Sequence, residues 1–222
     1  MAVRKFVLLV AGHDIDGDPG SVGQGSTEAK ETVQITDKVY NLLASHKNIL
    51  VERVPHTMDY VDSVNWANKL YKNLTDGIVV EIHKNSFNRS ASGNEVLIPA
   101  GSDATSKKLA NAIQSQLTAQ TKLPNRGVKE RGDLYLIREI NMYACLVEAG
   151  FIDKDPISDA FDDKYARGIA NGICDFFGES RPGATPAPKP TPAPAPKPTP
   201  QPTVSYVKAG TLDGVDYYKK KG

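Results

Sequence analysis

The sequence predicts an α/β fold: a three-layer sandwich with a central, largely parallel twisted sheet flanked by helices, followed by a proline-rich linker and a short basic tail. Two observations support this class. Apolar runs typical of strands alternate with amphipathic segments typical of helices up to the proline-rich stretch. Hydrophobic residues make up 40% of the 222 residues and charged residues 24%, as in soluble globular proteins.

Six short segments have the composition of strands. Lys5–Ala11 is a continuous apolar run, which is typical of a strand covered on both faces. The runs at 49–54 and 77–82 are rich in valine and isoleucine, the residues that favour strands. Shorter apolar runs follow at 95–98, 134–137 and 144–147.

Four segments have the periodicity of helices. The segments 27–45 and 61–72 place their apolar residues roughly on one side. The segment 104–120 repeats them at steps of four. Pro156 is expected to open a final helix, because the first-turn N–H of a helix has no partner and its loss costs little. The inward stripes of the last two helices are expected to be Leu109, Ile113 and Leu117, and Tyr165, Ile169, Ile173 and Phe176.

Ionisable residues follow three of the predicted strands and open one helix. His13, His83 and Glu148 each come at the end of an apolar run, and Glu28 starts the helix at 27–45. Ligands of parallel α/β sheets bind at the carboxyl ends of the strands. If these strands are neighbours, the four side chains meet at one edge of the sheet.

Two histidines and one glutamate are a common ligand set for catalytic zinc. Three protein ligands leave the fourth position open for water, whose pKa zinc lowers to about 7. A further carboxylate must then take the water proton and deliver it to the leaving nitrogen. Glu148 suits this role, because burial after an apolar strand raises a carboxylate pKa. Taken singly, each of the four residues has a simpler structural explanation.

Other polar residues are expected to be structural. His46 and His56 are expected at the surface. The carboxylates Asp14, Asp16 and Asp18 loosely resemble a calcium loop, but glycine stands where its bidentate glutamate belongs. These three residues are therefore interpreted as shaping the loop after His13.

Three ordered motifs resemble the zinc N-acetylmuramoyl-L-alanine amidases of the amidase-3 type over about residues 5–177. They are GHDIDGDPGSVGQGSTEAK, DGIVVEIHKNS and NRGVKERGDLYLIREINMYACLVEAGFID. The resemblance implies a peptidoglycan hydrolase that cleaves the bond between N-acetylmuramic acid and L-alanine. It implies one Zn²⁺ per chain on His13, Glu28 and His83, Glu148 as acid and base, and Arg126 on the substrate side.

The motifs depart from the family pattern at three places. Asp14 and Ile15 follow the first histidine where the family usually has two glycines, so the loop must be rearranged. Glu81 stands where a serine often precedes Ile-His, and Tyr143 replaces a common proline. None of these departures removes a proposed ligand.

Composition divides the chain into three parts: a catalytic domain at 1–180, a linker at 181–203 and a basic tail at 204–222. Ten of the fifteen prolines lie between Pro182 and Pro202, which predicts a polyproline-II spacer. Residues 181–222 carry a net charge of +5, which leaves −4 for the rest of a chain whose total is +1. The tail is expected to bind anionic wall polymers, to be the opening of a truncated module, or to have no partner.

Two other functions are open on the sequence alone. Cys145 is a candidate nucleophile of a cysteine peptidase, although its apolar surroundings favour a buried thiol, as they do for Cys174. The second alternative is a non-catalytic wall-binding protein with an amidase-like body. Nucleic acid is not an expected partner. Membrane insertion is not expected either, because no apolar run reaches the ~18 residues of a membrane span.

The first residues do not have the pattern of an export signal. The apolar run after Lys5 is short and passes directly into Gly12 and His13. Together with the resemblance, this predicts a bacteriophage endolysin that stays in the host cytoplasm until a holin releases it to the cell wall.

Overall fold

A six-stranded sheet forms the centre of the computed structural model, which describes residues 5–14, 16–72, 77–183, 206–212 and 215–220. Its strand order is β4-β1-β5-β8-β6-β7. The strands are β1 (Lys5–Ala11), β4 (Ile49–Arg53), β5 (Ile78–Asn85), β6 (Asn94–Pro99), β7 (Asn125–Arg131) and β8 (Tyr143–Phe151). Two further short strands, β2 (Val22–Gly23) and β3 (Ser26–Thr27), pair with each other.

The sheet is largely parallel, as predicted. β1 pairs in parallel with β4 and β5, and β5 pairs in parallel with β8. β6 pairs antiparallel with β8 and parallel with β7. The carboxyl ends of β1, β5 and β8 therefore lie next to one another at one edge of the sheet.

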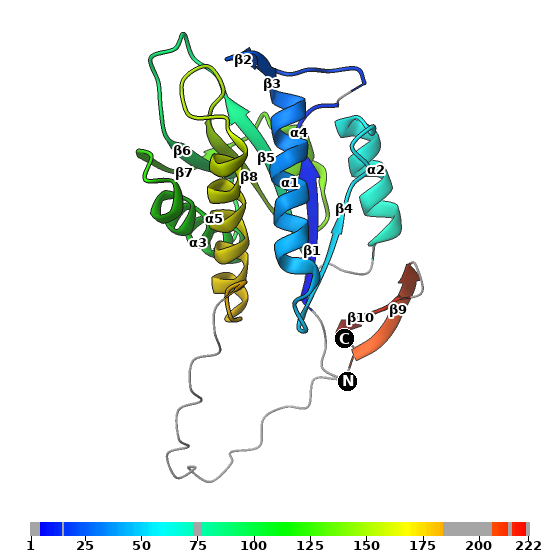
Figure 1. The fold of residues 1–222 in the computed structure, drawn as a ribbon. Coiled ribbons are helices and arrows are strands. Elements are labelled where there is room, and N and C mark those ends of the chain that lie inside the picture. The colour runs from blue at the N-terminus through cyan, green and yellow to red at the C-terminus, as the bar shows by residue number, and fades with distance from the viewer. Residues whose placement is uncertain (1–4, 15, 73–76, 184–205, 213–214, 221–222) are drawn as a thin grey trace, which may run out of the picture.

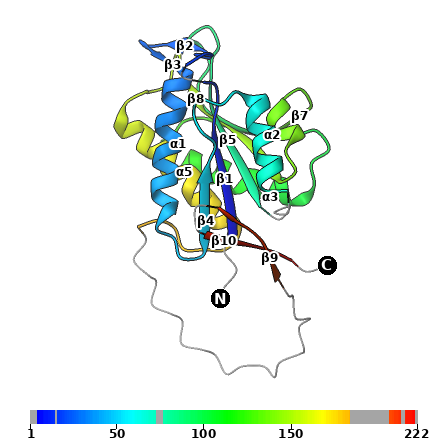
Figure 2. The ribbon, with the colours of Figure 1, turned by 90° about the vertical axis from the view of Figure 1, so that its right-hand side faces the viewer.

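The helices found within the described residues cover the two faces of the sheet. They are α1 (Glu28–Ala44), α2 (Tyr60–Leu70), α3 (Ala104–Thr121), α4 (Tyr135–Glu139) and α5 (Asp159–Phe177). Helices α1 and α5 lie side by side over one face (Figure 1), and the strands separate α1 from α2 (Figure 2). These layers confirm the predicted three-layer sandwich.

The alternation of side chains along each strand supplies both halves of the core. Val7, Leu9 and Val80 belong to the cluster that contains residues of α1, α3 and α5. Their neighbours Leu8 and Val79 belong to the cluster on the opposite face, with residues of α2 and α4. The central strands are buried on both sides, which explains why they are apolar throughout.

Two expected elements were wrong. The run at 134–137 forms most of helix α4 instead of a strand, and its Leu136 and Ile137 are buried. A short apolar run does not distinguish a strand from a buried helix by its periodicity. The final helix begins at Asp159 behind Ser158, so Pro156 precedes it in the loop.

The tail contains two antiparallel strands, β9 (Tyr206–Leu212) and β10 (Val215–Lys220). The expected linker lies almost wholly outside the described residues, so the boundaries of the three parts stay predictions. No helix within the described residues combines the length and the apolar composition needed to cross a membrane.

Candidate metal centre and active site

The carboxyl ends of β1 and β5 bring the three predicted ligands together. His13 follows β1, His83 lies within β5, and Glu28 is the first residue of α1. Each offers one ligand atom, and these atoms all lie within 4.8 Å of one another. The three residues therefore lie together at one edge of the sheet.

The Glu28 carboxylate lies between the two imidazoles. Its Oε2 is 3.2 Å from Nε2 of His13, and its Oε1 is 2.9 Å from Nδ1 of His83. The two rings meet edge to face with their centroids 5.0 Å apart. Two nitrogens and a carboxylate thus face a common centre, which is the donor set of a catalytic zinc site.

Backbone contacts hold the Glu28 carboxylate in place. The backbone N–H groups of Ser21 and Lys84 donate to its two oxygens at 3.0 and 3.1 Å. The hydroxyl of Thr27 accepts from the N–H of Lys30 and caps α1 directly before Glu28. The helix start and the adjacent strand therefore fix the carboxylate between the histidines.

Two glycines leave room for the imidazoles. A Cβ on Gly12 would lie 2.4 Å from the His83 ring, and one on Gly20 would lie 2.6 Å from the His13 ring. Gly20 has φ +63°, a conformation that favours glycine. His13 itself has φ 67°, which is uncommon outside glycine and occurs at sites where function demands a constrained backbone.

The electrostatics of this centre favour a positive charge. Burial lowers the pKa of His83, but Glu28 and Glu81 outweigh it and raise that pKa well above its usual value. Glu28 raises the pKa of His13 despite partial burial. The two imidazoles in turn lower the pKa of Glu28, although burial acts in the opposite direction. A bound cation would supply the charge that these groups favour, so the residues fit a metal ion.

Each of the two histidines contacts a second carboxylate through its other ring nitrogen. Oδ2 of Asp18 lies 2.8 Å from Nδ1 of His13, and Oε1 of Glu81 lies 3.1 Å from Nε2 of His83. Metal-binding histidines commonly use their second ring nitrogen in this way, which sets the tautomer and the ring orientation. Neither contact was predicted from the sequence. Glu81 lies two residues before His83, so the period of a strand already places it on the same face.

Glu148 lies beside the proposed ligands. It is directly opposite His83 in the pairing of β5 with β8. Burial raises the pKa of Glu148 to about 7; His83 opposes this shift, whereas Glu28 supports it. Its Oε2 is buried and has no hydrogen-bond partner among the described residues.

Arg126 lies on the far side of Glu148 from the ligands. Its Nε donates to Oε2 of Glu95 at 3.0 Å, and Glu95 lies opposite Glu148 in the sheet. The guanidinium also lies 5.0 Å from the centroid of the Phe151 ring. Arg126 is therefore near the centre but makes no contact with the proposed ligands.

The residues expected to be structural stay outside the group of ligands. His56 pairs with Asp37 at 3.0 Å, and His46 lies 3.2 Å from the carbonyl oxygen of Ser180. Asp14 accepts the N–H of Asp16 and shapes the loop after His13. Neither histidine belongs to the potential metal-binding group found in the described part of the chain.

The cysteines do not form a nucleophilic centre. Cys145 is fully buried, and burial raises its pKa far above the usual range. It packs in the core on the face opposite Leu146, whereas a nucleophile must be accessible and ionised. Cys174 is also buried and free. Both thiols are core residues, as expected from their apolar surroundings.

Comparison with known proteins agrees with this geometry. Residues 7–176 match the family described as N-acetylmuramoyl-L-alanine amidase. The uncharacterised protein YqiI of Bacillus subtilis is 34% identical over 181 residues, covering 78% of this chain and 85% of that protein. The sporulation-specific N-acetylmuramoyl-L-alanine amidase of the same species is 28% identical, covering 75% of this chain and 66% of that one.

A solved structure shares the fold. The crystal structure of N-acetylmuramoyl-L-alanine amidase from Clostridium difficile 630 matches with a TM-score of 0.73 at 26% identity, covering 80% of this chain and 98% of that one. The matched region spans most of the chain and contains all four proposed site residues. The chain therefore belongs to the amidase-3 family of N-acetylmuramoyl-L-alanine amidases.

Proposed function

We propose that this peptidoglycan amidase works with one zinc ion held by His13, Glu28 and His83, and with Glu148 as its acid and base. The observation that carries the proposal is the convergence of three ligating atoms within 4.8 Å of one another beside Glu148, whose Oε2 is buried. Zinc bound there would polarise the carbonyl of the muramic acid lactyl group and lower the pKa of the attacking water.

Glu148 supplies the proton transfers of the reaction. Its ionised carboxylate accepts a proton from the attacking water and then donates it to the nitrogen of the departing L-alanine. A group that must both accept and release a proton works best with a pKa near the operating pH, and burial brings Glu148 to about 7. Asp18 and Glu81 keep the two imidazoles oriented while this occurs.

The bond that is cleaved defines the products. Digestion of purified cell walls is expected to release new amino groups on L-alanine without new reducing sugar ends, because only the amide bond is hydrolysed. Dinitrophenyl labelling of the digest measures the amino groups, and a reducing-sugar assay is the control. New reducing ends would indicate a glycosidase and contradict the proposed reaction.

We also propose that the basic tail attracts the enzyme to anionic wall polymers. The support is the net charge of +5 in residues 181–222, including Lys208 and the lysines at 219–221. Clustered lysines bind polyanions in a salt-dependent way and raise the local concentration of an attached catalytic domain. Release from a phage-infected host stays a prediction.

Removing the tail is expected to affect only the attack on intact walls. A chain that ends at Gly183 keeps the ion pair of Arg181 with Asp175, so its catalytic body is preserved. It should hydrolyse a small soluble muropeptide at the full rate but lyse walls more slowly at low salt. The deficit should shrink as salt rises, because screening removes the advantage of the full chain.

A full-length control with the same net charge as the shortened chain separates the effect of charge from the effect of chain length. Full-length protein with its four tail lysines, Lys208 and those at 219–221, replaced by glutamine should behave like the shortened chain. Equal binding of all three proteins to walls at low salt would show that the tail has no targeting function.

A further inference from the structure

Two hollows of different character flank the catalytic centre. The first has a volume of about 460 Å³ and reaches His13 and His83. Its walls come from the end of β1, the start of α2 and the region of α4. The second has a volume of about 290 Å³ and begins at Asn85, two residues beyond His83, on the side of β8 and β7. A substrate that extends in both directions from a scissile bond at the centre would meet both hollows.

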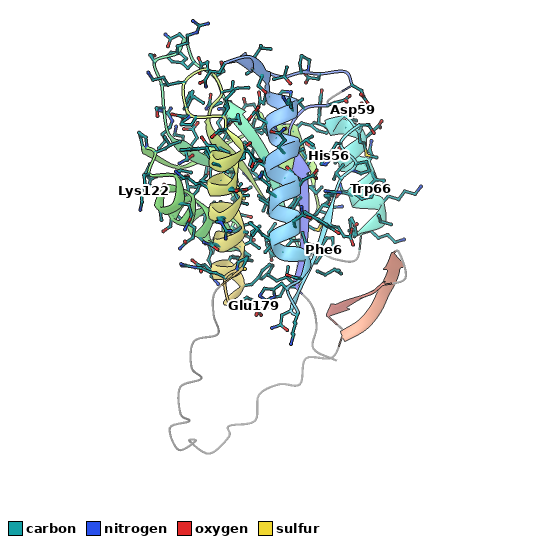
Figure 3. The ribbon with its side chains drawn as sticks, viewed as in Figure 1. Phe6, His56, Asp59, Trp66, Lys122 and Glu179 are labelled. Atoms are coloured by element: carbon teal, nitrogen blue, oxygen red, sulfur yellow. The ribbon has the colours of Figure 1, made fainter. Side chains whose placement is uncertain are left out.

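The first hollow is acidic and aromatic. Tyr60 and Tyr135, from two different helices, meet edge to face with their centroids 5.5 Å apart. Tyr60 is 58% exposed, so its ring is available to a ligand. Figure 3 shows Asp59 at the same upper end of α2, near the loop that follows β1. The carboxylates that line this hollow are Asp14, Asp18, Asp59, Glu81 and Asp133, and no described lysine or arginine does so.

The second hollow has a cationic wall. Arg126 lines it together with Phe87 and Phe151, and none of its described lining residues is acidic. The Nε of Arg126 is bound to Glu95, but its terminal nitrogens make no hydrogen bond within the described residues. Lys129 also binds Glu95, so two cations surround one carboxylate and the local charge is positive.

The substrate of the proposed reaction has the same asymmetry. On one side of the scissile amide is a sugar, rich in hydroxyl groups and without charge, and on the other is a peptide with free carboxylates. Aromatic faces pack against sugar rings, and carboxylates accept hydrogen bonds from hydroxyls. Arginine binds carboxylates through charge-assisted hydrogen bonds.

We infer that the substrate crosses the site in one direction, with its sugar in the hollow beside Tyr60 and Tyr135 and its peptide carboxylates toward Arg126. The inference rests on the proposed function and adds the orientation of the substrate. The reverse orientation would place the peptide carboxylates beside Asp14 and Asp59, which have no ion pair within the described residues, and like charges repel. The other three carboxylates of this hollow are already paired with His13, His83 and Arg131.

Three soluble substrates test the orientation. They are an N-acetylmuramyl peptide with free carboxylates, its carboxamide analogue, and the same peptide on the N-acetylglucosaminyl-N-acetylmuramyl disaccharide. The wild-type protein should have a higher kcat/KM for the free carboxylates than for the carboxamide, and a higher kcat/KM for the disaccharide than for the monosaccharide. Equal values for the carboxylate and carboxamide forms would overturn the inference.

Variants assign each preference to one hollow. Tyr60→Ala should lower kcat/KM for the disaccharide about fivefold, the size of one aromatic contact, while the preference for carboxylates remains. Tyr60→Phe should keep the wild-type value because it keeps the ring. Val61→Ala, in the same turn of α2 but outside the hollow, is the matched control.

Arg126→Gln should show the opposite pattern. It should reduce kcat/KM for the free carboxylates about tenfold, which removes the difference from the carboxamide, while the preference for the disaccharide remains. Arg167→Gln, an exposed arginine on α5, is the control for charge alone. If Tyr60→Ala instead lost the preference for free carboxylates and Arg126→Gln lost the preference for the disaccharide, the orientation would be the reverse.

Failure of the orientation is distinguishable from failure of the proposed function. If the wild-type protein cleaves none of the three substrates, the proposed function fails. If it cleaves them but Tyr60→Ala leaves the preference for the disaccharide unchanged, the orientation fails alone. Should Arg126→Gln not fold because Glu95 loses a partner, the carboxamide comparison on wild-type protein and the Tyr60 variants still decide the question.

Discussion

Replacing His83 with alanine is expected to abolish wall lysis and most of the zinc binding. The imidazole would contribute one of the three proposed ligand atoms, and its loss leaves Glu28 with a single histidine partner. Zinc content measured by atomic absorption should fall from about one ion per chain to near zero. Treatment of the wild-type protein with excess EDTA should have the same effect on activity, and added zinc should restore it.

His56→Ala is the matched control for this experiment. His56 pairs with Asp37 away from the centre, so its loss should change neither zinc content nor activity. Full activity of the wild-type protein in excess EDTA would contradict the metalloenzyme mechanism. Wild-type zinc content in His83→Ala would contradict the assignment of this ligand.

Glu148→Gln is expected to reduce turnover by roughly 10²–10⁴-fold while zinc binding is retained. Glutamine keeps the size of the side chain but cannot accept the proton of the attacking water. Steady-state kinetics on a soluble muropeptide, with zinc content measured on the same sample, would separate this effect from loss of the metal. Glu139→Gln, on the exposed end of α4, is the control and should leave the rate unchanged.

Glu148 is also expected to determine the acidic limb of the pH profile of activity. Activity should rise with pH as Glu148 ionises, because only the carboxylate accepts a proton. Burial places its pKa at about 7, and a cation bound to His13, Glu28 and His83 lowers it, so the midpoint should lie at or below that value. A Glu148→Gln variant with wild-type turnover would show that this residue is structural.

The order of strands and helices could be predicted because it depends on local patterns. The apolar run of Lys5–Ala11 and the four-residue steps in α3 reflect burial of particular faces, and these periods are visible in the sequence. Where the pattern was ambiguous, the prediction failed. The apolar run at 134–137 packs as helix α4, and β7, with its charged and mostly exposed residues, was not expected as a strand.

The proposed metal ligands and Glu148 were identified from the sequence by their motifs, whereas their surroundings were not. From the sequence, Glu81 was only a departure from the family pattern, and Asp18 was expected to shape a loop. In the structure these two carboxylates hold the second nitrogens of the histidines. Such contacts depend on backbone geometry, including the positive φ of His13, which a motif does not specify.

The sequence by itself determined which residues are available for catalysis and that strands and helices alternate around them. Only the tertiary structure decided that β1, β5 and β8 are neighbours and that β6 reverses direction beside Glu148. The physical reason is that sheet order depends on pairing between segments far apart in the chain, as in Val10 with Glu81 and His83 with Glu148. Burial of Glu148 and the contrast between the two hollows follow from that pairing.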